Sequence, residues 1–115
     1  MKKKTKTIKK RFKKLRIVSS NYVITYHDEI RDEKGNYLDG RAYESTQHML
    51  ILETLNYEPM LRTIFHEVLH IINFELCFTL ENEEERNIQL TTGLTCFMRD
   101  NPEFIMEYIK VLNKR

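Results

Sequence analysis

Residues 59–76 read PMLRTIFHEVLHIINFEL, and this stretch decides the fold because its apolar positions recur with the period of a helix. The proline at its start suits a first helical turn. Apolar side chains follow on most sides of the expected helix, so the pattern predicts a central, buried helix over residues 60–76. The polar side chains within so apolar a helix therefore need a physical reason to be there.

The helix carries an H-E-x-x-H motif, His66-Glu67-Val68-Leu69-His70. At about 100° per residue, His66 and His70 lie roughly 40° apart on adjacent turns, so both imidazoles can bind one ion. Glu67 lies roughly 100° from His66, within reach of a metal-bound water, where it can act as general base. The alternative is two core histidines beside a solvated glutamate. Unpartnered polar groups on an apolar helix are costly, and a zinc ion removes that cost.

A catalytic zinc needs a third protein ligand and an open fourth position. A histidine six residues after His70 would indicate a metzincin, but that position is Leu76. A carboxylate from the next helix is the remaining choice. The candidates are Glu81, Glu83, Glu84 and Glu85. If Leu90 and Leu94 face the first helix, Glu84 lies near the same face and Glu85 is the second choice.

The order of patterns predicts an α+β fold, with a small antiparallel sheet followed by three helices. Alternating apolar residues predict strands over residues 15–27, 40–44 and 47–53, with an exposed loop at 31–39. An edge strand beside a zinc cleft can bind a peptide backbone by strand addition, and residues 48–52 are expected there. Two further helices are predicted, one over residues 82–100 and one starting at Pro102.

The charge distribution divides the chain into two parts. Residues 1–16 carry ten Lys and Arg and no Asp or Glu, whereas residues 17–115 carry nine Lys and Arg against all 17 acids. We predict a basic, flexible tail over residues 1–16 and a single domain over residues 17–115. The tail is either a solvated extension or a contact to nucleic acid or another polyanion.

The composition excludes several classes of protein. With 41% hydrophobic and 31% charged residues, the chain has a globular composition. No apolar run approaches the roughly 20 residues that span a bilayer, and the basic start lacks the apolar segment of a secretory signal. Cys77 and Cys96 are therefore expected to be reduced thiols in an intracellular protein.

Several short motifs together resemble those of a known family. They are the T-x-x-H-E-x-x-H helix from Thr63, the acidic turn of residues 81–85, L-x-x-G-L from Leu90, and Asp100-Asn101-Pro102. On these motifs, residues 22–113 resemble small phage- and prophage-encoded zincin-like metallopeptidases of the ImmA/IrrE type. The resemblance implies a minimal, gluzincin-like zincin core with zinc on His66, His70 and Glu84. Asn87 stands where the family has a small residue, so Glu85 remains an alternative third ligand.

The prediction is therefore a zinc-dependent metallopeptidase, with Glu67 as the catalytic base and Zn²⁺ as the cofactor. The resemblance implies a protein or peptide substrate, with a transcriptional regulator as one candidate, in the cytoplasm of a bacterial host. No membrane contact is expected. The alternative is a zinc-stabilised, non-catalytic binding module whose basic tail contacts nucleic acid or an acidic partner.

Overall fold

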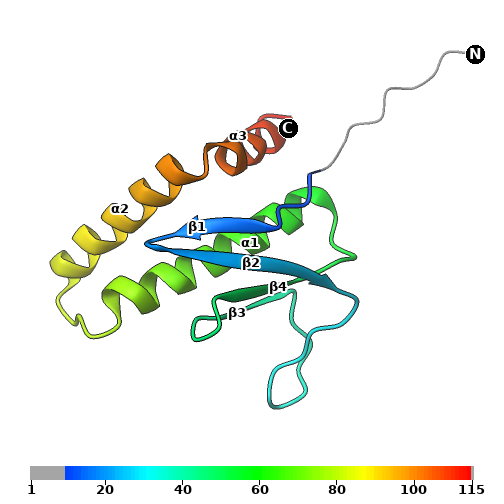
Figure 1. Cartoon of the computed structure of the whole chain (residues 1–115), viewed down its shortest axis with the longest axis horizontal. Helices are drawn as coiled ribbons and strands as arrows, with labels where there is room; N and C mark the ends of the chain where they lie inside the picture. Colours follow the sequence, from blue (N-terminus) through cyan, green and yellow to red (C-terminus); the bar gives the residue numbers. More distant parts are fainter. Residues whose placement is uncertain (1–9, 115) are drawn as a thin grey trace, which may run out of the picture.

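The computed structural model describes residues 10–114 and confirms an α+β fold in which the strands precede the helices (Figure 1). The strands are β1 (Lys14–Ile17), β2 (Ser20–His27), β3 (Gly40–Tyr43) and β4 (His48–Leu52). The helices are α1 (Tyr57–Ile72), a short π-helix η1 (Asn73–Cys77), α2 (Glu83–Asp100) and α3 (Pro102–Leu112). No helix in the described part of the chain is long and apolar enough to cross a membrane.

The sheet is mixed, so the prediction of a purely antiparallel sheet is wrong. Its order is β1-β2-β4-β3, with antiparallel pairs at both edges and a parallel pair, β2 with β4, in the centre. Burial explains this order. Met49 and Ile51 of β4 are fully buried, whereas β3 has no fully buried residue, so β4 takes the central position and β3 the edge. Residues 28–39 are long enough to carry the chain past β4 to that edge.

One face of the sheet packs against α1, and the described helices leave the other face open (Figure 1). The period of two places alternate strand residues on the helix side, where Tyr22 and Ile17 are fully buried. The helix contributes one continuous apolar side to the same core. Its fully buried apolar residues are Leu61, Ile64, Val68, Ile71 and Ile72. The prediction of a central, buried helix is therefore only half right, because Arg62, His66 and His70 are exposed.

The predicted tail overlaps the folded domain. Of residues 1–16, the structure describes 10–16, and these include the first three residues of strand β1 and the buried ring of Phe12. That ring packs edge-on against the ring of Phe104, with the ring centroids 5.3 Å apart. The Tyr26 hydroxyl donates to the Phe12 carbonyl oxygen at 2.8 Å. The strand pattern predicted over residues 15–27 covers most of β1, whereas the buried Phe12 lay within the predicted tail because it stands between Arg11 and Lys13. Residues 1–9 of the predicted tail lie outside the described residues.

Asn101 ties the first strand to the helices. Its side-chain amide donates to the carbonyl oxygen of Arg16, and its Oδ1 accepts from the backbone N–H of Arg16. Asn101 is the N-cap residue of α3, but its side chain makes no cap bond there. Pro102 nevertheless begins α3 as predicted, since a first-turn residue needs no N–H partner.

Helix α2 crosses close to α1 because Gly93 has no side chain. A Cβ built on Gly93 would lie 2.5 Å from Cγ2 of Ile72, which is fully buried and stiff at its branched Cβ. Alanine favours a helix over glycine by about 1 kcal/mol in an open position. Here the steric overlap opposes that gain.

We therefore expect Gly93→Ala to lower the free energy of unfolding by about 1–2 kcal/mol, because overpacking a tight contact outweighs helix propensity. Urea denaturation followed by circular dichroism measures the change. Thr95→Ala, at an exposed position of the same helix, is the control and should leave stability unchanged or slightly raised. A stabilised Gly93→Ala variant would show that α1 and α2 do not approach this closely.

Candidate active site

The histidines of the motif lie side by side on the exposed surface of α1. The Nε2 atoms of His66 and His70 are 3.0 Å apart, and the ring centroids are 4.6 Å apart with an interplanar angle of 84°. In this arrangement one Nε2 donates its N–H to the lone pair of the other. Binding one ion through both Nε2 atoms therefore requires both rings to carry their hydrogen on Nδ1. The i, i+4 spacing on the helix produces this convergence without bending the backbone.

The pair fits two positions of a zinc site. Two nitrogens bound at 2.0–2.1 Å to a tetrahedral zinc ion lie roughly 3.3–3.4 Å apart, close to the observed separation. Imidazole nitrogen is a ligand that zinc prefers, and the two donors point to one place on the solvent side of the helix. In the described part of the chain, however, no group of three or more His, Cys, Asp or Glu side chains is assembled to hold a metal.

Glu67 lies next to the histidines but on the buried side of α1. It is 6% exposed and is the buried charged residue of the described core. Burial raises the pKa of its carboxyl above the ordinary value of 4.5, while the imidazoles of His70 and His66 act in the opposite direction. Glu44 also raises this pKa and Arg41 lowers it. A carboxylate whose pKa is raised is a stronger proton acceptor for general base catalysis.

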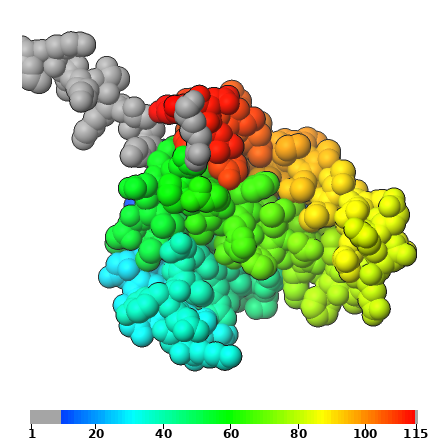
Figure 2. All heavy atoms as spheres, turned by 180° about the vertical axis from the view of Figure 1, so that it is seen from behind, coloured from blue at the N-terminus to red at the C-terminus, as the bar shows by residue number. Residues whose placement is uncertain are grey.

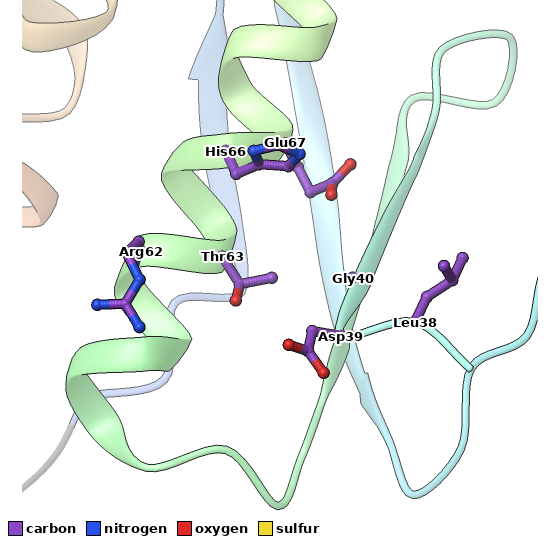
Figure 3. A pocket seen from close by; sticks show the side chains of 7 residues that line it. All are labelled: Leu38, Asp39, Gly40, Arg62, Thr63, His66 and Glu67. Carbon is purple, nitrogen blue, oxygen red and sulfur yellow. The ribbon is translucent and has the colours of Figure 1, made fainter. Parts of the chain in front are cut away.

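A pocket of about 400 Å³ opens beside His66 and Glu67 (Figure 3). One wall is α1, and the other is β3 with the residues just before it. The lining residues are Leu38, Asp39, Gly40, Arg62, Thr63, His66 and Glu67. In the space-filling view, α1 (green) lies between residues 28–39 (cyan) below it and α2 (yellow to orange), so this side of the helix faces solvent (Figure 2). The motif therefore lies at the edge of an open pocket.

Strand β3, not β4, forms the edge beside the pocket. The prediction that residues 48–52 line the cleft as an edge strand is wrong, because β4 is paired on both sides. The backbone N–H of Leu52 donates to the carbonyl oxygen of Asp39. In an antiparallel pair every second residue bonds to the partner strand, so the backbone groups of Arg41 and Tyr43 also point to β4. The backbone polar groups of Gly40 and Ala42 then point away from the sheet. These groups are available to an added strand.

Asp39 is the pocket residue that sequence reasoning missed. The loop composition of residues 31–39 predicted only an exposed segment, which is correct for the side chain of Asp39. Its position opposite α1 depends on the pairing of β3 with β4 and on the packing of α1 against β3. No local pattern carries that information.

The predicted third ligand is not beside the histidines. Glu84 lines a separate surface hollow on α2 with Asn87, Ile88, Thr91 and Thr92. Glu85 is also exposed, and its backbone N–H donates to the Asn82 side chain, which caps the helix. Both acids therefore lie in the first turn of α2, where they complement the helix dipole. Their role as zinc ligands stays a prediction.

The remaining histidines and the cysteines lie elsewhere. The Nε2 atoms of His27 and His48 are each 2.7 Å from the Thr25 hydroxyl, on the open face of the sheet. Both residues are therefore hydrogen-bonded within the sheet rather than part of the pocket. Cys77 is buried, Cys96 is half-buried, and both are free thiols.

Comparisons of the chain with models of known protein families, with curated proteins and with solved structures give no match. The function is therefore inferred from the motif and from the geometry of the site. The geometry brings together His66, His70, Glu67 and a pocket, and these groups have to carry the proposal.

The buried Glu67 carboxylate should cost stability in the metal-free protein. With zinc removed by a chelator, we expect Glu67→Gln to raise the free energy of unfolding at pH 7, because the amide carries no charge to desolvate. The raised pKa means that the folded chain binds this proton more tightly than the unfolded chain. The cost is therefore absent below pH 4.5 and complete above the raised pKa, so the two proteins should converge in acid.

Denaturant titrations between pH 3.5 and pH 8 measure this difference. Glu81→Gln removes an exposed carboxylate of the same kind and should follow the wild-type curve throughout. A Glu67→Gln variant that is less stable than wild type at pH 7 would contradict the account, since the carboxylate would then be stabilised by its surroundings.

Proposed function

We propose that this protein is a zinc-dependent metallopeptidase in which His66 and His70 hold the ion and Glu67 is the catalytic base. The observation that carries the proposal is the convergence of the two Nε2 atoms at 3.0 Å beside a buried carboxylate in the wall of an open pocket. Two core histidines with purely structural roles would be expected to bond to the protein interior. Here both rings are exposed and face each other.

Glu67 has a defined role in this chemistry. A zinc ion bound at the pair would acidify a water molecule and polarise the scissile carbonyl. The Glu67 carboxylate accepts the proton of the attacking water and then delivers it to the leaving amine nitrogen. Its burial supports both steps, because the raised pKa makes the carboxylate a stronger base and lets it hold the proton between them.

Strand β3 supplies a place for the peptide backbone. An extended peptide added to its free edge would bond to the outward groups of Gly40 and Ala42. Gly40 also contributes to the pocket wall beside Glu67. A peptide held there would pass the catalytic base with its backbone aligned, which is the positioning that hydrolysis of one chosen bond requires.

The proposal retains Glu84 as third ligand, with Glu85 as the second choice, and requires the start of α2 to move toward the histidines when zinc binds. Glu84→Gln should then lower zinc affinity at least tenfold, because a neutral amide is a poor replacement for a carboxylate ligand. Competition with a chromophoric chelator measures this affinity. Glu83→Gln in the same turn is the matched control. If Glu83→Gln, Glu84→Gln and Glu85→Gln each bind zinc as the wild type does, the first turn of α2 supplies no ligand.

The test of the catalytic role is Glu67→Gln, which we expect to remain folded and zinc-loaded while losing activity by roughly 10²–10⁴-fold. The amide matches the carboxylate in size but accepts no proton at neutral pH. His66→Ala should instead lower zinc occupancy. Metal analysis and a functional assay in the native host provide the readouts. Full function of Glu67→Gln together with loss in His66→Ala would make zinc structural and overturn the peptidase proposal.

One observation favours the second candidate, a zinc-stabilised binding module for polyanions. The Lys and Arg side chains of the described residues 10–16 are all exposed, and five further lysines precede them in the sequence. Removing residues 1–9 tests this function while leaving Phe12 and β1 in place. A binding module would lose affinity for nucleic acid with a shallower salt dependence, whereas the peptidase would keep its activity.

A further inference from the structure

Asp39 presents a carboxylate to the pocket without a partner. Among the described residues its side chain makes no hydrogen bond or ion pair, and in Figure 3 it points from the strand side toward α1. Its backbone is fixed, because the Asp39 carbonyl accepts from the N–H of Leu52 at 2.8 Å, which extends the β3–β4 ladder by one residue. The backbone position of Asp39 is thus fixed, while its carboxylate is unused by the fold.

The positive charge of the pocket is already matched. Arg62 is the arginine among the lining residues, and its guanidinium lies 3.4 Å from a carboxylate oxygen of Glu58, one turn earlier on α1. The neighbouring Arg41 pairs with Glu33 in the preceding loop. The Asp39 carboxylate is therefore an unmatched negative charge at the pocket. Such a charge favours a cationic ligand.

The shape of the pocket suits a long side chain. Leu38 supplies an apolar wall, and the Thr63 methyl group faces Gly40 so closely that a Cβ on Gly40 would lie 2.7 Å from it. The volume of about 400 Å³ is sufficient for an extended aliphatic stem that ends in a charged group. Lysine and arginine pack their stems on apolar surface while the charged head reaches a polar partner.

We infer that this pocket selects an arginine or lysine side chain of the substrate, bound through Asp39, next to the peptide bond that Glu67 helps to hydrolyse. The inference rests on the proposed peptidase function for its reference to the cleaved bond. The binding preference itself depends only on the pocket. Asp39 is then the residue that determines specificity, and the substrate class is a protein with an exposed basic residue in an extended segment.

The opposite specificity would come from Arg62. A pocket that selects acidic side chains would need this guanidinium to turn from Glu58 to the ligand and would place the ligand's carboxylate near Asp39 and Glu67. The ligand's carboxylate would be repelled by these carboxylates, so the observed side chains favour the basic ligand.

Binding by blocked amino acids tests the preference without requiring turnover. The full-length, metal-free protein is titrated with N-acetylarginine amide, its neutral isostere N-acetylcitrulline amide, and N-acetylglutamate amide, with nuclear magnetic resonance of the backbone amides as the readout. We expect arginine to bind roughly three- to tenfold more tightly than citrulline, with shifts at residues 38–40 and 62–67. Asp39→Asn should abolish this difference.

Asp28→Asn is the matched control, since it removes the same charge from an exposed position outside the pocket lining and should keep the preference. Equal binding of arginine and citrulline, a preference for glutamate, or an unchanged preference in Asp39→Asn would each overturn the inference. Fluorogenic peptide pools then separate it from the proposed function. Arginine-selective binding with no cleavage of any pool by the zinc-loaded protein would overturn the peptidase proposal alone. Cleavage without a basic preference would overturn the role of Asp39.

Discussion

The close approach of α1 to strand β3 is the constraint on which the candidate site depends. Gly40 and Thr63 lie so near each other that no Cβ fits at Gly40. This contact and the complete burial of five aliphatic side chains of α1 set the rotation of the helix about its own axis. One turn beyond Thr63, Glu67 must then face the sheet side and is buried, while His66 and His70 face solvent. The separation of one buried base from two exposed ligands thus follows from a steric contact outside the motif.

The same constraint explains how the fold tolerates a buried carboxylate. Helix α1 buries five aliphatic side chains completely against the sheet and α2, and burial of each stabilises the helix by about 1.5–3 kcal/mol. That packing, rather than a dedicated ion pair, offsets the free energy of desolvating the Glu67 carboxyl. An ion pair at Glu67 would stabilise the fold but make the carboxylate a weaker base, because a nearby cation lowers a carboxyl pKa. Among the described residues the Glu67 side chain makes no hydrogen bond or ion pair, which is consistent with a group kept for chemistry.

Local patterns in the sequence were sufficient for the parts of the structure that depend on local geometry. The helix over the motif, the acidic start of α2 at Glu83 and the start of α3 at Pro102 follow from periodicity and helix-end preferences. The convergence of His66 and His70 follows from the helix pitch alone. The parallel pairing of β2 with β4 could not be predicted in this way, because it depends on which strand offers the most apolar side chains to α1. Asp39 was missed for the same reason, since it reaches the pocket only through that pairing.

The loop before β3 shows why a site wall can come from a segment with little core. Within residues 28–39, the Asp32 carboxylate accepts from the backbone N–H groups of Lys34 and Asn36, and Gly35 supplies the positive φ of 85° that the turn requires. The N–H of Leu38 donates to the carbonyl of Ile30, whose side chain is buried. The loop is therefore ordered by its own polar groups and one apolar anchor. A wall fixed in this way pays little conformational entropy when a ligand binds, so a single exposed carboxylate at its end can contribute to selectivity.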